Sequence, residues 1–335
     1  MSELVLRWGL LSTARINRRV IGAIEETDRS VIAAVASRDG SRAAEYAKTH
    51  GIPHWYGSYQ EMLAAPDIDV VYVSLPNAMH VEWGMRAAEA GKHVLIEKPI
   101  ALDPRDVVGL EAIANDKGVV IQEASMMRFH PQTSLLRDLV ASGVIGEPRW
   151  AHGAACFSMS GSGDIRLDPD GGGSLWDLGT YPVTLFNAVL GRRPLEVSAL
   201  ARVGTTGVDL TFAGQIRYEG DVLGSFATSM ETWPSNNAEF AGSTGVITVE
   251  DPWLFPIGVG ASGRVTIRTS SDAEGSTSHR SVADANAYVE EVTAMESMIL
   301  DGANEVFPLR ESATNIATLT ALLKSASSGR VVSVD

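Results

Sequence analysis

The first third of the chain alternates short, wholly apolar runs with longer amphipathic stretches. Apolar runs without polar alternation are typical of strands buried on both faces of a parallel sheet, and the amphipathic stretches predict helices. The predicted strands are Leu4–Leu11, Val31–Ala36, Val70–Ser74, Val94–Ile96 and Val119–Gln122. The predicted helices are Arg15–Glu26, Ser41–His50, Val81–Ala90 and Arg105–Lys117. Strand–helix units with short links predict an α/β Rossmann domain, with a doubly wound parallel sheet, over residues 1–124.

Beyond residue 124 the pattern changes to helices followed by alternating strands. The predicted helices are Pro131–Ser142, a glycine-led helix through Tyr181, Ala285–Leu300 and Glu311–Ala326. The predicted strands are Pro148–Phe157, Glu196–Arg202, Asp209–Tyr218, Val222–Met230, Ala238–Ala241, Val246–Glu250, Arg264–Thr269 and Val331–Val334. Short strands joined by turns such as Glu219–Asp221 predict hairpins. Residues 125–335 are therefore expected to form a C-terminal α+β domain with a largely antiparallel open sheet.

The helices can cover only one face of that sheet, so the other face meets water or a second subunit. Phe226, Met230 and Trp233 are the apolar side chains that favour a second subunit. We expect the second domain to bind substrate and to form a homodimer or a higher homo-oligomer through its sheet.

The composition limits the classes of partner. The chain has 335 residues, which fits two domains, and its formal net charge of −14 argues against nucleic acid and anionic membranes. The single cysteine, Cys156, excludes a disulfide within the chain and fits a reducing compartment. The sequence has no N-terminal signal pattern, no membrane-length apolar run and no metal-ligand spacing of histidine and cysteine. We expect a cytoplasmic enzyme without a metal.

Two opposite charges, Glu97 and Lys98, end the buried run Val94–Ile96. Pro99 cannot continue a central strand, so both charges lie at its carboxyl end, the edge where open α/β sheets bind ligands. Taken alone, such a pair is more often a surface salt bridge. The residues that follow the preceding strand, and are expected at the same crevice, are Leu75, Pro76, Asn77 and His80.

The turn between the first strand and the first helix has Ser12, Ala14 and Asn17 where a dinucleotide fingerprint has glycines. Serine and alanine are small enough for the backbone to approach a pyrophosphate, and the helix N-terminus supplies N–H groups. Asn17 is the least comfortable replacement, because that glycine normally packs helix against strand. The turn is equally compatible with a cofactor loop and with an ordinary connection.

The second strand is followed by Ser37 and Arg38, and an acid comes only at Asp39. A carboxylate at the strand tip would bind the ribose 2′-hydroxyl of NAD, whereas an arginine accommodates the 2′-phosphate of NADP. The order of residues favours NADP, with NAD possible, and a solvated Arg38 is the alternative.

Three glycines at positions 171–173 precede a helix that carries Asp177 and Tyr181. Glycine costs backbone entropy, which suggests that these three serve a close approach of the backbone to another group. Asp177 and Tyr181 are four residues apart and share one helix face. A tyrosine beside an aspartate can donate a proton, and a capped helix with Tyr181 in the core is an equal alternative.

Together, these segments resemble the glucose–fructose oxidoreductase / inositol dehydrogenase / MocA (Gfo/Idh/MocA) family. The segments that carry the resemblance are Glu97–Pro99, Pro76–His80 and Gly171–Tyr181. The segments that narrow it, with Tyr181, to the branch of dimeric dihydrodiol dehydrogenase and NADP-dependent xylose dehydrogenase are Arg166–Pro169 and Glu123–Pro131. Ser235–Glu239 and Gly242–Gly245 extend the likeness into the second sheet, so it covers nearly the whole chain.

The resemblance implies hydride transfer between a nicotinamide cofactor and a hydroxyl or carbonyl carbon of a sugar, an inositol or a trans-dihydrodiol. It implies Lys98 and Tyr181 as the catalytic pair, with Asp177 in support. An ammonium near the phenol would favour the phenolate, which could accept the substrate's hydroxyl proton. The expected cofactor-binding residues are Ser12, Thr13, Ala14, Arg15, Ile16, Ser37, Arg38, Leu75, Pro76, Asn77, His80, Glu97, Lys98 and Arg128. The candidates for the substrate site are Arg166, Asp168, Trp176 and Asp177.

Two other functions stay open at this point. One is a glycoside hydrolase that uses tightly held NAD to oxidise its sugar transiently. The other is a non-catalytic sensor that binds NAD(P), and the joint presence of Lys98 and Tyr181 argues against it.

Overall fold

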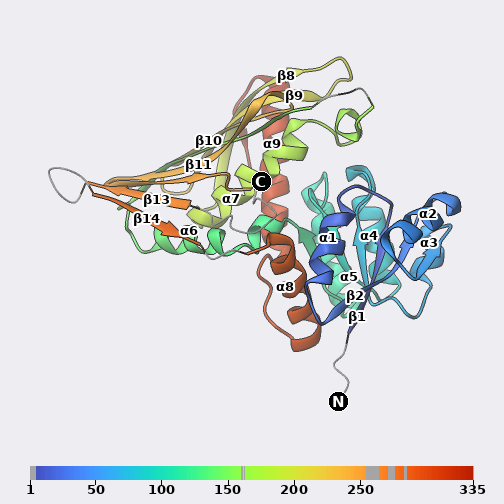
Figure 1. Ribbon diagram of the computed structural model, residues 1–335. Coiled ribbons are helices and arrows are strands. Elements are labelled where there is room, and N and C mark those ends of the chain that lie inside the picture. Colours follow the sequence, from blue (N-terminus) through green and yellow to red (C-terminus); the bar gives the residue numbers. More distant parts are fainter. Residues whose placement is uncertain are drawn as a thin grey trace. The chain divides into compact units, whose positions relative to one another are not determined.

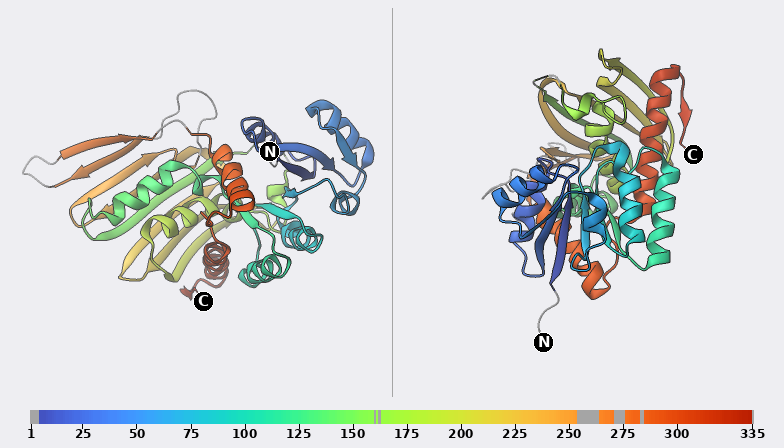
Figure 2. Two further views of the ribbon diagram at one scale, coloured as in Figure 1. Left: turned by 90° about the horizontal axis from the view of Figure 1, so that it is seen from below. Right: turned by 90° about the vertical axis from the view of Figure 1, so that its right-hand side faces the viewer.

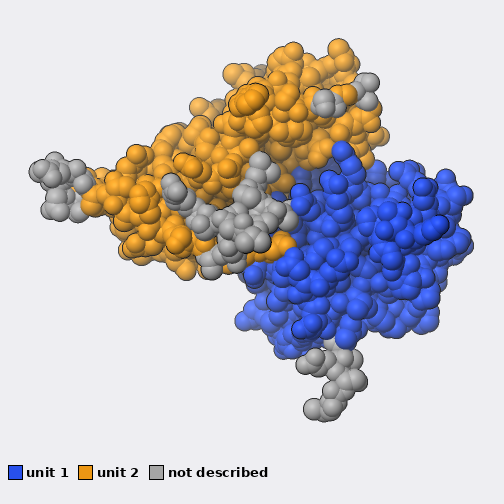
Figure 3. Space-filling view, in the orientation of Figure 1, with its two compact units in different colours: residues 1–129, 287–313 blue, residues 130–286, 314–335 orange. Residues whose placement is uncertain are grey.

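The computed structural model describes residues 5–159, 161, 163–253, 264–270, 276–282 and 285–334. The chain forms two compact units, blue and orange in Figure 3. Unit 1 consists of residues 1–129 and 287–313, and unit 2 of residues 130–286 and 314–335. Each unit has a β-sheet of its own.

Unit 1 contains a six-stranded parallel sheet with the strand order β3-β2-β1-β4-β5-β6. Two of these strands, β1 and β2, are labelled in Figure 1. Its strands are β1 (Leu6–Leu11), β2 (Ser30–Ala36), β3 (His54–Tyr56), β4 (Val70–Val73), β5 (His93–Glu97) and β6 (Ile121–Ala124). Its helices are α1 (Asn17–Glu25), α2 (Gly40–His50), α3 (Tyr59–Leu63), α4 (His80–Glu89), α5 (Pro104–Lys117) and α8 (Ala287–Asp301), with the short 3₁₀ helices η1 (Asn77–Met79) and η2 (Met126–Arg128). The order reverses direction between β1 and β4, as in doubly wound dinucleotide-binding sheets, which confirms the predicted Rossmann domain.

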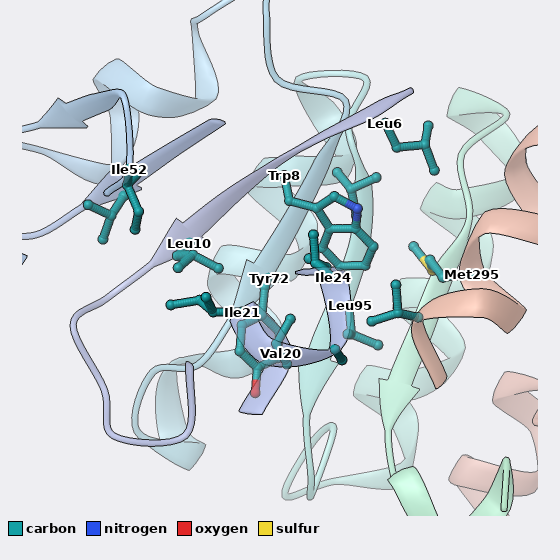
Figure 4. Close-up of a cluster of buried hydrophobic side chains, with 14 of the residues drawn as sticks. Leu6, Trp8, Leu10, Val20, Ile21, Ile24, Ile52, Tyr72, Leu95 and Met295 are labelled. Atoms are coloured by element: carbon teal, nitrogen blue, oxygen red, sulfur yellow. The ribbon is translucent and has the colours of Figure 1, made fainter. Parts of the chain in front are cut away.

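The apolar runs of the sequence form the centre of this sheet. Trp8, Tyr72 and Leu95 are fully buried in one cluster, which Val20 of α1 and Met295 of α8 complete (Figure 4). The buried indole of Trp8 donates to Ser30 Oγ at 2.9 Å, so its polar atom is satisfied. Helix α8 therefore belongs to the core of unit 1, although it lies far along the chain. Leu4, the predicted start of the first strand, lies outside the described residues.

Unit 2 contains a nine-stranded sheet with the order β14-β13-β12-β11-β7-β10-β9-β8-β15. All neighbouring strands are antiparallel except β7 and β10, which confirms the largely antiparallel sheet. Its strands are β7 (Pro148–Ser158), β8 (Pro194–Val203), β9 (Asp209–Tyr218), β10 (Val222–Ser229), β11 (Glu231–Gly242), β12 (Gly245–Glu250), β13 (Arg264–Thr269), β14 (Ser276–Ser281) and β15 (Val332–Ser333). Its helices are α6 (Pro131–Ala141), α7 (Thr180–Leu190) and most of α9 (Leu309–Ser328), with the short helices η3 (Ile165–Leu167) and η4 (Leu175–Gly179).

Helices cover one face of the unit 2 sheet (Figure 2). Phe186 of α7 packs edge-to-face on Phe240 of β11, and Leu322 of α9 closely approaches the backbone of Gly214 on β9. The expectation that Phe226 and Met230 lie on the uncovered face is wrong, because they are 3% and 1% exposed. Strand alternation turns Phe226 toward the helices, where it stacks on Phe212. Trp233, in contrast, is 89% exposed.

Candidate active site

The turn after β1 holds a serine in a glycine-like conformation. Ser12 has a φ of 136°, in the region that favours glycine. Its hydroxyl contacts Ser74 O at 3.0 Å and accepts from Ala14 N at 3.1 Å. Buried Asn17 donates to Ser12 O at 2.8 Å and accepts from Ser74 Oγ at 2.6 Å. The residues that replace the fingerprint glycines are thus bonded to one another and to the end of β4.

Helix α1 begins directly after this turn, and its first turn contains no acidic residue. The helix therefore places no carboxylate of its own first turn at its positive dipole end, which suits a pyrophosphate. Thr13 and Ala14 are partly exposed and Arg15 is exposed, whereas Ile16 packs against the apolar cluster of unit 1. The turn fits a dinucleotide although the sequence motif fails.

The end of β2 bears on the choice between NAD and NADP. The Asp39 carboxylate caps α2 by accepting from Ser41 N at 2.9 Å and Arg42 N at 3.2 Å. These donors lower the pKa of Asp39. Ser37 is buried, and Arg38 is exposed. Asp39 is engaged in the cap, and the first exposed side chain after the strand is the cation Arg38.

The structure corrects the prediction that His80 lines the crevice. It is fully buried, and its Nδ1 and Nε2 each lie 2.8 Å from a backbone carbonyl, of Pro99 and Leu75 respectively. Burial lowers the pKa of His80 against the effect of these carbonyls. The ring ties the loop after β4 to the loop after β5 and presents neither nitrogen to a ligand. Pro76 and Asn77 are partly exposed at the same edge.

Glu97 and Lys98 lie at the carboxyl end of β5, as predicted. Glu97 Oε1 accepts the hydroxyl of Tyr72, and its Oε2 accepts the backbone N–H of Lys98 at 3.2 Å. Glu97 is thus bound within unit 1 and holds the backbone at Lys98. The Lys98 side chain is partly exposed.

Arg128, expected at the cofactor, is only 5% exposed. Its guanidinium donates to Glu311 at 2.6 Å and lies 5.0 Å from the ring centroid of Phe307. These contacts give Arg128 a structural role inside unit 1 that the sequence did not indicate.

The glycines of unit 2 accommodate the chain itself. A Cβ on Gly172 would lie 2.4 Å from the carbonyl oxygen of Asp168, and one on Gly173 would lie 2.3 Å from Asp209 Oδ1. Buried Asp209 accepts from Ser174 Oγ at 2.6 Å and Leu175 N at 2.7 Å. Sequence reasoning missed Asp209, although a charged residue at the start of an apolar strand could have pointed to it.

Asp177 and Tyr181 follow this anchored turn, on the π-helical η4 and on α7. Arg166 Nε donates to Asp177 Oδ2 at 2.6 Å, and its Nη1 lies 3.3 Å from Asp164. Tyr181 is half-buried and stacks on Trp253 with ring centroids 6.3 Å apart. Of the other substrate-site candidates, Trp176 is buried and Asp168 is exposed. Arg166 therefore fixes Asp177 on η4, four residues before Tyr181, within unit 2.

None of the helices in the described part of the chain is long and apolar enough to cross a membrane. Nor do the described histidine, cysteine and acidic side chains form a group that could hold a metal ion.

Comparison with known proteins agrees with the geometry. Residues 6–125 match an oxidoreductase family with an NAD-binding Rossmann fold, and residues 133–248 match the GFO/IDH/MocA C-terminal domain. An NADP⁺-dependent D-xylose 1-dehydrogenase of Haloferax volcanii is 30% identical, over 98% of this chain and 100% of its own. A trans-1,2-dihydrobenzene-1,2-diol dehydrogenase of Macaca fascicularis is 34% identical, over 76% of this chain and 77% of its own.

Among solved structures, KijD10, a 3-ketoreductase from Actinomadura kijaniata in complex with NADP and TDP-benzene, has a TM-score of 0.88. It is 29% identical, over 96% of this chain and 98% of its own. KijD10 has also been solved with a lysine or a tyrosine substituted. The Rossmann sheet, the second sheet and these matches together show that the chain is an NAD(P)-dependent oxidoreductase that belongs to the Gfo/Idh/MocA family.

Proposed function

We propose that this oxidoreductase transfers a hydride between NADP and a hydroxyl or carbonyl carbon of a sugar, an inositol or a trans-dihydrodiol. The observation that carries the proposal is the carboxyl edge of the unit 1 sheet. There the glycine-like turn at Ser12 follows β1, and Lys98 follows β5. The relatives that act on xylose and on a dihydrodiol support the substrate class.

The preference for NADP is supported by Arg38, which is exposed after β2, and by the engagement of Asp39 in the α2 cap. A guanidinium binds a phosphate more strongly than a hydroxyl. We expect Arg38→Ala to weaken NADPH binding at least tenfold and to leave NADH binding within about twofold. Fluorescence titration with both cofactors measures this, and equal losses for the two would contradict the proposed role.

We propose Lys98 and Tyr181 as catalytic residues, with Asp177 in support. Lys98 has its backbone fixed by Glu97, and the partly exposed Tyr181 stands one helical turn after Asp177. The substitution of a lysine and of a tyrosine in the similar ketoreductase is in keeping with this choice.

The chemistry divides between cofactor and chain. A bound nicotinamide accepts or supplies the hydride. In the proposed reaction the Tyr181 Oη accepts the proton of the substrate hydroxyl during oxidation and returns it during reduction. The Lys98 ammonium favours the phenolate and stabilises negative charge on the reacting oxygen. Asp177, held by Arg166, would orient a substrate hydroxyl by accepting its hydrogen bond.

Lys98→Met and Tyr181→Phe test these roles. We expect each variant to lose about a hundredfold or more in kcat on the best substrate of a panel of aldoses, inositols and dihydrodiols. NADPH binding should stay within about threefold in both. Lys117→Met, a lysine paired with Asp116 at the end of α5, is the control and should keep full turnover. Near-normal kcat in either test variant would refute its role, and free sugar released from a glycoside without net cofactor turnover would identify a hydrolase instead.

We also propose a homodimer through the uncovered face of the unit 2 sheet. In the strand register, Ala154, Ala227 and Ala213 lie side by side across β7, β10 and β9, on the face opposite the helices. Such a row of small residues allows close approach of another sheet, and Leu200 and Leu223 are exposed nearby. Ala227→Arg should give monomers in sedimentation velocity, and an unchanged dimer would place the interface elsewhere.

A further inference from the structure

A group of buried carboxyl and phenol side chains lies at the carboxyl ends of β4, β5 and β6. Tyr72 and Glu123 come from β4 and β6, Glu97 ends β5, and Glu291 comes from α8. Tyr72, Glu123 and Glu291 are 0%, 4% and 1% exposed. All four belong to unit 1, and the proposed hydride transfer assigns a role to none but Glu97.

Within this group, Glu123 is the carboxyl bonded to the loop that carries Lys98. Its Oε1 accepts the backbone N–H of Ile100 at 3.2 Å, two residues after Lys98. No hydrogen bond of ordinary geometry reaches its buried Oε2 from the described residues. A buried carboxylate with one neutral donor is poorly stabilised, so its charge depends on the charges around it.

The groups that face Glu123 are of both signs. Lys98 stabilises its charged form, and Glu97 opposes it. Glu291 of α8 is buried beside both acids, and the nearby hydroxyl of Ser312 favours the charged form of Glu123. The hydroxyl of Tyr72 is part of the group, and the hydroxyl of Tyr288 lies near that of Tyr72. Burial prevails over the favourable groups and raises the pKa of Glu123 to about 7.

We propose that Glu123 is a positioning residue for Lys98. Its carboxylate is an internal counter-ion of the Lys98 ammonium, and this counter-ion is lost when Glu123 is protonated. Its bond to Ile100 N holds the backbone after Lys98 in place. Ionised, it supplies a negative charge that stabilises the Lys98 ammonium, and protonated, it leaves that ammonium less stabilised. Coupling between two titrating groups is reciprocal. Since the Lys98 ammonium stabilises ionised Glu123, ionised Glu123 stabilises the Lys98 ammonium to the same extent. The role in catalysis rests on the proposed function, whereas the coupling of charges does not.

The coupling can be measured without substrate or cofactor. The sequence has five lysines, at positions 48, 92, 98, 117 and 324, so ¹³C-dimethylated lysines of the full chain give few NMR signals. Lys98→Arg assigns the Lys98 signal by its loss. In the native chain we expect this signal to titrate in two steps, a minor one near neutral pH that reports Glu123 and a major one at alkaline pH.

Two variants separate charge from structure. Glu123→Gln keeps an acceptor for Ile100 N but cannot ionise, so the minor step should vanish and the major step should move about one pH unit lower. Glu296→Gln is the control. Glu296 is a buried glutamate like Glu123, but it lies on α8 outside the group and accepts from Thr27 Oγ1 at 2.9 Å. It should keep both steps.

A native chain without the minor step, or a Glu123→Gln variant that keeps it, would overturn the inference. Loss of the step in both Glu→Gln variants would overturn it too, since a general disturbance of unit 1 would then be the cause. A chain that shows the step but oxidises no member of the panel of aldoses, inositols and dihydrodiols with NADP⁺ would contradict the proposed function alone.

Discussion

The turn that leads into α1 in unit 1 and the turn that leads into α7 in unit 2 differ in their glycines. The first has none at its three fingerprint positions, yet Ser12 adopts a glycine-like φ and hydrogen bonds hold the turn. The second has three in a row, and Gly172 and Gly173 make room for the chain's own carbonyl and carboxylate oxygens. Glycine content alone therefore does not identify a cofactor loop; the backbone conformation and the neighbouring atoms do.

The strongest test of this contrast is Gly173→Ala in unit 2. Its φ of 108° is unfavourable for alanine, and the new Cβ would meet Asp209 Oδ1 at 2.3 Å. Because two hydrogen bonds hold Asp209, it cannot move aside freely. We expect the free energy of unfolding to fall by more than about 3 kcal/mol in urea titrations.

Gly22→Ala in α1 is the matched control, because a Cβ there meets no atom within 4 Å. It should leave stability unchanged or raise it by up to about 1 kcal/mol. Equal stability of the Gly173 and Gly22 variants would mean that the unit 2 glycines are not required for packing.

The two units also differ in how many hydrogen bonds their buried carboxyl groups accept. The pH dependence of stability tests the consequence for unit 1. Asp209 in unit 2 accepts two close hydrogen bonds, whereas Glu123 in unit 1 accepts one. The pKa of Glu123 is raised from 4.5 to about 7, so the folded chain binds its proton more tightly than the unfolded chain. The tighter proton binding stabilises the fold by about 3 kcal/mol. This contribution is fully present below the pKa of Glu123 in the unfolded chain and is lost as the pH rises through its pKa in the folded chain.

Urea titrations between pH 5 and pH 8 measure the effect. Glu123→Gln should remove most of this loss of stability between pH 5 and pH 8, and Glu291, whose pKa burial also raises, should leave a residual slope. Glu296→Gln should keep the native slope. A Glu123→Gln variant with the native slope would show that Glu123 does not titrate in this range.

The comparison also shows what the sequence could predict. Apolar runs located the parallel strands, and Pro99 located Glu97 and Lys98 at a strand end, because these features depend on neighbours along the chain. The contacts that shape both turns join distant residues: Asn17 and Ser74 are 57 positions apart, and Ser174 and Asp209 are 35 apart. The group around Glu123 needs α8, from the far end of the chain. Periodicity assigns a residue to a face but does not say which distant residue it meets.

Asn17→Gly restores a fingerprint glycine in unit 1 and sharpens the comparison further. If glycine content governed cofactor binding, this variant would bind NADPH more tightly. We expect the opposite, because the change removes the bonds to Ser12 O and Ser74 Oγ and leaves buried polar groups unpaired. Stability should fall by about 2 kcal/mol, and NADPH should bind roughly tenfold more weakly in fluorescence titrations. Tighter binding would restore the glycine rule.

Ser12→Gly is the mildest change. Glycine accepts a φ of 136° without strain, and this gain offsets the lost hydrogen bonds of the serine hydroxyl. We expect stability within about 1 kcal/mol of the native chain and a Kd for NADPH within about threefold. Ser12→Ala, which loses the hydroxyl but keeps the strain, should cost about 1 to 3 kcal/mol. Equal stability of the alanine and glycine variants would contradict this account. It would mean that the turn does not depend on a residue suited to positive φ, nor on the hydroxyl contacts of Ser12 to Ser74 and Ala14.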